Sequence, residues 1–429
     1  MASIQKRENS YRIRVSNGRD SSGKQLMETI TFTPDPTKTE KQNQKALEIF
    51  VMEFEQRVKN GKYLDGEKIT FKEFSEKWMK DYAIRHLEKS TLGLYEGLLR
   101  DHINPSIGHL KLSKIQPTHI NALYNQLLEQ RKDGKPGGYA PRTVKHVHVL
   151  INSIYSAALK WNVALDNPCS RVDPPKMIRN TNDIKFFTLE QTEHFLQALD
   201  MEYFTPCKAH DRIDDTGNLY HVREYQEKHK LSQQLKLFFY MALFLGMRKG
   251  ELIALEWSDI DFNNHSVSIT KSTGIVKKEI ITKPPKTKSS IRVVAIPDVV
   301  FELLKEYRKE QLKYRLSIGN QWIGDNYIFI QWNGKQMYPS TPYAAFKKLI
   351  KRYNNTVTDE TLKLPNIPLH GLRHTSATLL ISQNVDVKTV SGRLGHSQTS
   401  TTMDIYAHSL KKMDEVAAET LNDLFSKQA

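Results

Sequence analysis

The spacing of the hydrophobic residues changes twice along the chain, and this constrains the fold more than any other feature. Near the N-terminus, Tyr11, Ile13 and Val15 alternate with polar residues, as in a strand with one buried face. From about Ile69 the spacing becomes helical, and beyond Thr188 helical stretches are mixed with short alternating runs. A chain of 429 residues also exceeds one ordinary core, since domains commonly have about 100–200 residues. We therefore expect a multidomain protein, mainly α with small β-sheets.

Glycine and proline residues mark the expected boundaries between domains. Gly61 and Gly66 bracket a linker after the first segment. Pro174 and Pro175 end the helical segment, and a basic linker at residues 176–185 follows. The expected domains span residues 1–64, 68–175 and 182–429.

The first domain is expected to be a small β-rich module. Strands are predicted around residues 11–15 and 26–32, and a helix at residues 39–60. Arg12 and Arg14 alternate with the apolar residues of the first strand and therefore share its exposed face. They fit a solvated strand face and contacts to phosphates equally well.

The second domain is expected to be a compact helical bundle. Four aromatic residues between Phe71 and Tyr82 form one stripe, which is more typical of a core than of base stacking. A helix beginning at Pro141 turns its apolar residues inward and leaves Arg142 and Lys145 around them. These two cations are candidate DNA contacts.

The third domain is expected to mix helices with a small sheet. Thr188 and Gln191 resemble a capping box, and residues 235–245 form an apolar helix. Residues 208–230 are polar and highly charged, which predicts a long surface loop or insertion. Three alternating runs predict strands at residues 267–269, 276–281 and 291–296.

Three short stretches of the third domain collect polar groups suited to a phosphodiester. In the first, Arg248 directly follows the apolar helix, so its guanidinium projects from a rigid base. An arginine can contact two phosphate oxygens at once, and Glu251, one turn on, can orient it.

The second stretch contains His370, Arg373 and His374, which share one face of a helix. The two histidines also have the spacing of a zinc-binding helix. However, Gly371 stands where a metalloprotease motif has glutamate, and no cysteine cluster lies nearby. No metal site is therefore expected.

The third stretch contains His396, followed ten residues later by Tyr406. A lone tyrosine is normally a half-buried aromatic residue. Beside cationic groups and a base, however, a tyrosine becomes a candidate nucleophile.

Taken in order, these motifs resemble the catalytic signature of the tyrosine recombinases, as in integrases of temperate phages and of conjugative transposons from Gram-positive bacteria. The matching elements are Arg248, His370-x-x-Arg373, Leu394-Gly395-His396 and Tyr406. The stretch from Pro284 to Ser290, followed by a strand, resembles the family's hairpin that carries a catalytic lysine. This assigns that role to Lys286, ahead of Lys283 and Lys288.

The resemblance implies an arm-type DNA-binding domain, a helical core-binding (SAM-like) domain and a mixed α+β catalytic domain, in that order. It implies site-specific recombination of a mobile element through a 3′-phosphotyrosyl intermediate, without a cofactor. Tyr406 is then the nucleophile, His370 accepts its proton, and Lys286 protonates the leaving oxygen. Arg248, Arg373 and His396 would stabilise the charge that develops on the phosphate.

The net charge of +15 favours a polyanionic partner, either nucleic acid or an acidic membrane surface. The positive excess is present in each of the three segments, which suits a protein wrapped along DNA. The expected partners are double-stranded DNA with core and arm-type attachment sites, three further protomers, and an accessory excisionase or DNA-bending protein. The two cysteines form no disulfide framework, and the N-terminus has no apolar signal core, so a cytoplasmic location is expected.

Two other functions fit parts of this pattern. A type IB topoisomerase shares the chemistry, but the extra N-terminal segment and the terminal helix argue against it. A DNA-binding regulator without catalysis has no use for Tyr406 among these cations. An apolar stripe within residues 416–425 fits contact with another subunit and packing on its own domain equally well.

Overall fold

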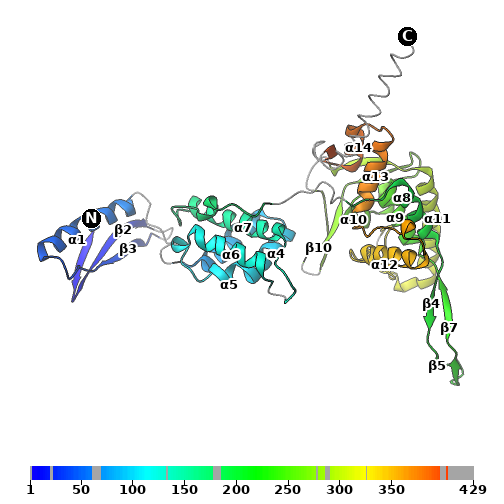
Figure 1. The fold of residues 1–429 in the computed structure, drawn as a ribbon, viewed down its shortest axis with the longest axis horizontal. Coiled ribbons are helices and arrows are strands. Elements are labelled where there is room, and N and C mark those ends of the chain that lie inside the picture. Colours follow the sequence, from blue (N-terminus) through cyan, green and yellow to red (C-terminus); the bar gives the residue numbers. More distant parts are fainter. Residues whose placement is uncertain are drawn as a thin grey trace, which may run out of the picture. The chain divides into compact units, whose positions relative to one another are not determined.

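A computed structural model describes residues 2–19, 23–59, 69–131, 134–176, 185–276, 279–285, 290–324, 326–396 and 402–403. The chain divides into two compact units, Met1–Ile178 and Arg179–Ala429 (Figure 1). In the described part of the chain, no helix is long and apolar enough to cross a membrane. The expected linker at residues 61–66, most of the one at 176–185 and the stripe at 416–425 lie outside the described residues.

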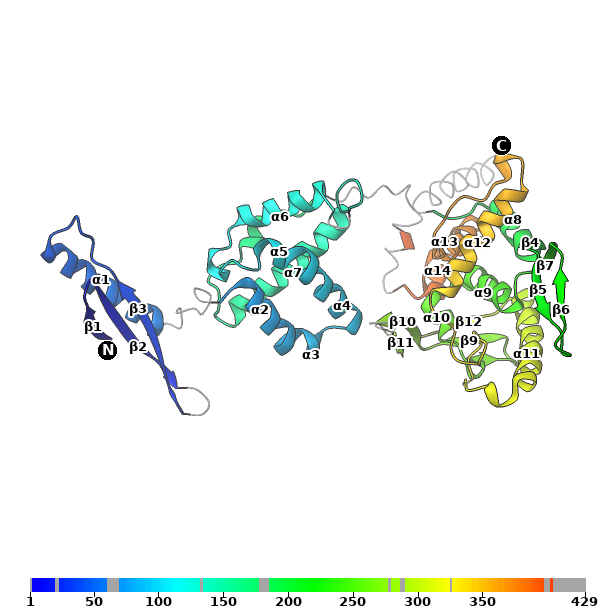
Figure 2. The same ribbon diagram turned by 90° about the horizontal axis from the view of Figure 1, so that it is seen from below.

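The first unit begins with a three-stranded antiparallel sheet, and a helix lies against one of its faces (Figure 2). The strands are β1 (Ser3–Arg7), β2 (Ser10–Arg19) and β3 (Gln25–Phe32), and the helix is α1 (Glu40–Lys59). Ile13 and Val15 are buried against α1, which confirms the predicted alternation. Arg12 and Arg14 therefore lie on the face of the sheet opposite α1.

The rest of the first unit is a helical bundle with a core of its own. Its α-helices are α2 (Phe71–Trp78), α3 (Ile84–His86), α4 (Lys89–Leu98), α5 (Asn104–Ile107), α6 (Pro117–Glu129) and α7 (Pro141–Lys160). Three residues of the aromatic stripe are buried, as a core role requires, whereas Tyr82 is 40% exposed. Arg142 and Lys145 are exposed on α7.

The second unit packs helices and small sheets around one large core. Its helices are α8 (Leu189–Asp200), α9 (Gln233–Phe244), α10 (Lys249–Ile253), α11 (Asp298–Ile318), α12 (Thr341–Thr356), α13 (Gly371–Ser382) and α14 (Val387–Leu394). The capping box of α8 is present, as predicted. The sheet nearest the core has the strand order β12 (Arg292–Ala295), β9 (Ser266–Ile269) and β8 (Ile260–Asp261).

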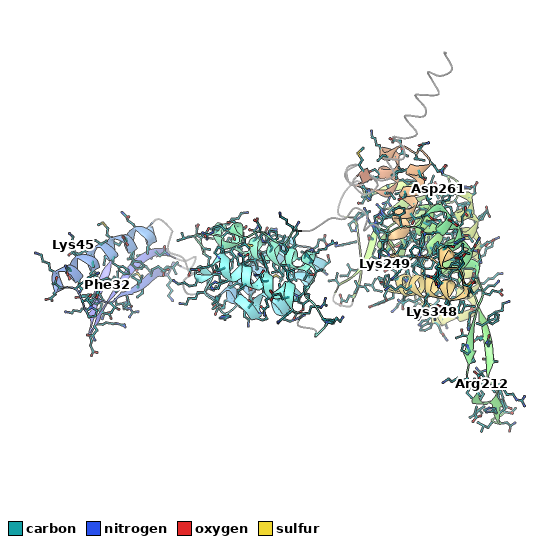
Figure 3. All side chains as sticks on the ribbon, in the orientation of Figure 1. Phe32, Lys45, Arg212, Lys249, Asp261 and Lys348 are labelled. Carbon is teal, nitrogen blue, oxygen red and sulfur yellow. The ribbon has the colours of Figure 1, made fainter. Side chains whose placement is uncertain are left out.

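Of the two alternatives for residues 208–230, the surface loop is wrong, because this segment belongs to a long antiparallel hairpin that starts before it. The hairpin projects from the helices of the second unit, with Arg212 in its outer part (Figures 1 and 3). Its strands are β4 (Tyr203–Cys207), β5 (His210–Ile213), β6 (Leu219–Val222) and β7 (Tyr225–His229). Most of their side chains are exposed on both faces, so no apolar alternation marks these strands in the sequence.

The strand predicted at residues 276–281 is also corrected. Val276 ends β10 (Ser272–Val276), and Glu279 begins β11 (Glu279–Lys283), which pairs with it antiparallel. No glycine or proline stands between the two strands in the sequence, so the usual signal of a chain reversal is absent.

Candidate active site

Arg248 stands between the apolar helix α9 and the short helix α10. The chain turns at Gly246, which has φ of +61°, and a Cβ there would lie 2.5 Å from Leu394 Cδ2. Glycine is therefore required both for the left-handed backbone and for the close approach of α14. Arg248 is the residue before α10, and its side chain is 37% exposed.

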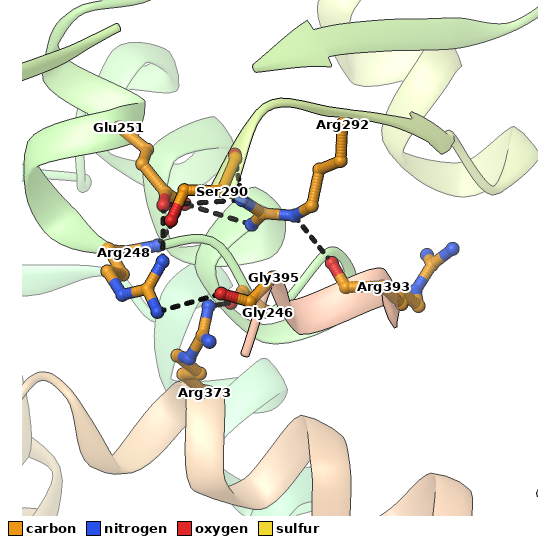
Figure 4. Close-up of polar contacts among 8 residues, drawn as sticks. All are labelled: Gly246, Arg248, Glu251, Ser290, Arg292, Arg373, Arg393 and Gly395. Atoms are coloured by element: carbon orange, nitrogen blue, oxygen red, sulfur yellow. Dashed lines mark hydrogen bonds and ion pairs between the residues drawn. The ribbon is translucent and has the colours of Figure 1, made fainter. Parts of the chain in front are cut away.

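Glu251 is held between two arginines (Figure 4). Arg248 donates to it from Nη1 at 2.8 Å and from its backbone amide at 2.9 Å. Arg292 donates from Nη2 at 2.9 Å and from Nη1 at 3.3 Å. Burial by itself raises the pKa of Glu251, but the hydrogen bonds and charges of Arg292 and Arg248 bring it below its ordinary value. This carboxylate is therefore ionised at neutral pH, and it accepts hydrogen bonds from both the side chain and the backbone of Arg248.

Arg373 lies in the first turn of α13 and is only 2% exposed. Its Nη1 donates to the carbonyl oxygen of Gly246 at 2.8 Å (Figure 4). This bond fixes the guanidinium against the turn that leads to Arg248, although 127 residues separate the two partners. The turn at Gly246 therefore helps to position both arginines that are predicted to bind phosphate: Arg373 binds its carbonyl oxygen, and Arg248 follows it in the chain.

His370 is the residue before α13, and its ring lies 4.9 Å from that of His374 in an edge-to-face arrangement. Burial, and then the charges of Arg373 and Arg248, lower the pKa of His370 to about 4. Burial is also the main reason that the pKa of His374 falls to about 4. Both rings are therefore neutral at neutral pH, and a neutral imidazole can accept a proton. Among the described residues, no group of three or more His, Cys, Asp or Glu side chains could hold a metal ion.

His396 follows the left-handed glycine that ends α14. Gly395 has φ of +70°, and its carbonyl oxygen accepts a hydrogen bond from Arg248 Nη2 at 3.2 Å. Nδ1 of His396 lies 2.7 Å from the hydroxyl of Thr402. If that hydroxyl donates to Nδ1, the ring proton is on Nε2 and can be donated to a phosphate oxygen. Burial, and then the charges of Arg373 and Arg248, lower the pKa of His396 to about 4.

The structure thus brings together Arg248, Glu251, His370, Arg373 and His396 from three separate stretches. The charges of Arg373 and Arg248 act on both His370 and His396, so these four groups surround one small region. Two guanidinium groups beside neutral imidazoles can bind an anion and exchange protons with it. Tyr406, Lys286 and Lys288 lie outside the described residues, and Lys283 ends β11. Arg12, Arg14, Arg142 and Lys145 belong to the other compact unit.

Sequence reasoning missed Arg292, which begins β12 directly after the lysine-rich stretch. Its side chain is 7% exposed, and it forms the second ion pair to Glu251. The only local signal was an arginine at the edge of a predicted strand. Its partner is 41 residues away, so the pairing follows from the tertiary fold.

Two family models match the chain. The model of the phage integrase family matches residues 214–413, and that of the phage integrase N-terminal SAM-like domain matches residues 70–128. The chain is 29% identical to a protein named tyrosine recombinase XerC-like from Caldanaerobacter subterraneus, over 97% of this chain and 96% of that protein. It is 26% identical to the ICEBs1 integrase of Bacillus subtilis, over 76% of each chain.

The fold is similar to that of solved integrases. A structure of the Tn1549 transposon integrase in complex with a circular intermediate DNA aligns with a TM-score of 0.59 and 18% identity. That alignment covers 81% of this chain and 99% of the other. A lambda integrase dimer bound to a COC′ core site aligns with a TM-score of 0.52 and 15% identity, over 94% of each chain. On this evidence the chain belongs to the phage integrase family, and it is a tyrosine-type site-specific DNA recombinase.

Proposed function

We propose that the cluster of Arg248, Arg373, His370 and His396 binds the scissile phosphate of double-stranded DNA and that Tyr406 attacks it. The observation that carries this proposal is the convergence of two arginines and two neutral histidines from three distant stretches of the chain. During attack, negative charge grows on the non-bridging oxygens. The guanidinium groups and the His396 N–H can stabilise that charge.

The proposed reaction exchanges one phosphodiester for another. The Tyr406 oxygen forms a bond to phosphorus while the bond from phosphorus to the 5′ oxygen breaks. His370 takes the phenolic proton, and Lys286 gives a proton to the 5′ oxygen. The product is a 3′-phosphotyrosyl ester and a free 5′ hydroxyl, and the reverse reaction with a new strand needs no ATP.

The direct test is to trap the covalent intermediate. DNA carrying a candidate attachment site, nicked near the cut so that the 5′-hydroxyl fragment diffuses away, is incubated with the protein. We expect a protein–DNA complex that survives SDS. If no such complex forms on any attachment-site DNA that the protein binds specifically, the proposed reaction is wrong.

The role of Lys286 predicts a selective chemical rescue. Lys286→Ala should cleave ordinary DNA slowly, because the 5′ alkoxide leaves without a proton, and general acid catalysis typically contributes about 10²–10⁴-fold. On a substrate whose 5′ bridging oxygen is sulfur, the thiolate leaves without protonation, so the variant should approach the wild-type rate. Both rates are measured by covalent-complex formation. Equal defects on the two substrates would move the acid role to Lys288 or Lys283.

We further propose that residues 1–64 bind arm-type DNA, residues 68–175 bind the core site and residues 182–429 carry catalysis. The positive charge of Arg14, together with slight burial and Arg7, lowers the pKa of Arg12, which indicates crowded cations on the sheet. Such crowding is repulsive in the free protein and is relieved by an anion. Arg142 and Lys145, exposed on α7, are proposed contacts to the core site.

The proposed arm contact predicts a change in salt dependence. Arg12→Gln/Arg14→Gln should weaken binding to flanking arm-site DNA and make its logarithmic salt slope shallower by roughly 2, one for each lost phosphate contact. Gel shifts at several salt concentrations measure both quantities. The control, Lys41→Gln/Lys45→Gln, removes two exposed cations from α1, where Figure 3 labels Lys45. Identical slopes for the two double variants would contradict the proposal.

Strand exchange between two duplexes requires four cleavages, so we propose four protomers in the active assembly. An accessory excisionase or DNA-bending protein would select the direction of the reaction. The protein would act on DNA in the cytoplasm, where its two cysteines stay reduced.

A further inference from the structure

We propose that Arg292 is a positioning residue for the cleavage reaction: it neutralises Glu251 and thereby leaves the charge of Arg248 available to the phosphate. This inference rests on the proposed function of the cluster. It concerns a residue that is 7% exposed and reaches Arg248 only through Glu251. Figure 4 shows the arrangement, with Glu251 between the two guanidinium groups.

The burial of the three side chains indicates which arginine neutralises the carboxylate. Glu251 is 3% exposed and Arg292 is 7% exposed, whereas Arg248 is 37% exposed. Arg292 faces the carboxylate with both terminal nitrogens, and it heads the causes that lower the pKa of Glu251. The charges of Glu251 and Arg292 thus cancel in a buried ion pair. The three side chains together keep one net positive charge, and it lies on Arg248, the arginine that is open to a ligand. Without Arg292, Glu251 would pair with Arg248 alone, and its negative charge would offset the positive charge that Arg248 offers to a phosphate.

Arg292 also donates to two backbone carbonyl groups, in two stretches of the chain. Its Nε donates to the carbonyl oxygen of Arg393 at 2.7 Å, and its Nη1 donates to that of Ser290 at 3.2 Å. The first carbonyl lies in the last turn of α14, just before Gly395 and His396. The second lies at the end of the stretch that contains Lys286. The planar fork of an arginine can make these bonds and the ion pair together, whereas a lysine cannot.

Gly395 lies against Arg292 and also binds Arg248. A Cβ at Gly395 would lie 2.9 Å from Arg292 Nη1 and 3.2 Å from its Cδ. The carbonyl oxygen of the same glycine accepts a hydrogen bond from Arg248. The glycine of the Leu394-Gly395-His396 motif therefore provides both a left-handed turn and the space that Arg292 occupies.

The test is a mutant cycle on nicked attachment-site DNA at saturating protein. Arg292→Gln should slow covalent-complex formation by roughly 10–100-fold, the range typical of residues that orient a binding group. Gel-shift affinity should change little. Glu251→Gln/Arg292→Gln should recover most of the loss, because no charge at position 251 then needs neutralising.

A pH profile gives a second readout that a purely structural role would not produce. In Arg292→Gln, Glu251 loses the largest influence that lowers its pKa, so the carboxylate becomes protonated at higher pH than in the wild type. Protonation releases Arg248, so the ratio of variant rate to wild-type rate should rise as the pH falls from about 7.5 to about 5.5. The control is Arg393→Gln, which removes a part-buried arginine that donates to the backbone carbonyls of Phe244 and Ala295. Within the described residues, no ion pair joins Arg393 to Glu251. The control should show no such rise and no rescue by Glu251→Gln.

Several outcomes would overturn the inference. It fails if Arg292→Gln cleaves at the wild-type rate, or if its defect is independent of both pH and the residue at position 251. If Arg292→Gln does not fold, the double variant is compared with Glu251→Gln alone, and a further loss of about tenfold or more would exclude the proposed role. Absence of any covalent complex with wild-type protein would instead refute the proposed function itself.

Discussion

Tyr406→Phe is expected to abolish the covalent protein–DNA complex while leaving DNA binding nearly unchanged. The substitution removes one hydroxyl group and keeps the aromatic ring, so only the nucleophilic oxygen is lost. The two arginines and the histidines that would hold the phosphate are unaffected. On nicked attachment-site DNA, the SDS-resistant band should therefore disappear, whereas gel-shift affinity should stay close to the wild-type value.

A matched control separates this effect from the general loss of a tyrosine hydroxyl. Tyr343 is 41% exposed on α12, and Tyr343→Phe should form the covalent complex normally. Wild-type amounts of complex in Tyr406→Phe would remove Tyr406 as the nucleophile. Loss of complex in both variants would indicate a defect that is not specific to Tyr406.

Arg373→Ala is expected to slow cleavage by roughly 10²–10³-fold at saturating DNA, the usual loss when one preorganised donor to a developing oxyanion is removed. No neighbouring cation can easily take the place of Arg373, because its side chain is 2% exposed and is held by a hydrogen bond to the carbonyl oxygen of Gly246. Arg248→Ala should give a loss of similar size. DNA affinity should fall much less, because many other cations of this basic chain can contact phosphates.

Single-turnover rates of covalent-complex formation, with affinity measured separately, distinguish the two effects. Lys348→Ala serves as the control, since it removes an exposed cation from α12 and should leave the single-turnover rate unchanged. If the arginine variants bound DNA weakly but cleaved it normally once bound, they would be binding contacts and would not stabilise the transition state. Thermal unfolding of Arg373→Ala should be recorded as well, because this variant leaves a buried carbonyl without its donor.

The sequence alone was sufficient to predict the elements that are determined by the spacing of residues close together in the chain. The alternation of Ile13 and Val15 identified the buried face of a strand, because side chains alternate between the two faces of a sheet. The spacing of the aromatic residues from Phe71 to Trp78 identified a helical core in the same way. The motifs around Arg248, Arg373 and His396 were recognisable because each needs only a few neighbouring residues.

Only the tertiary structure decided which of these groups meet and what supports them. The sequence contains no local sign that Arg373 binds the carbonyl of Gly246 or that Arg292 faces Glu251, because both pairs are distant along the chain. The hairpin from Tyr203 to His229 escaped prediction since both of its faces are exposed. Periodicity reports the burial of one face of an element, whereas a polar contact between distant segments depends on how the elements pack, and no repeating pattern records that packing.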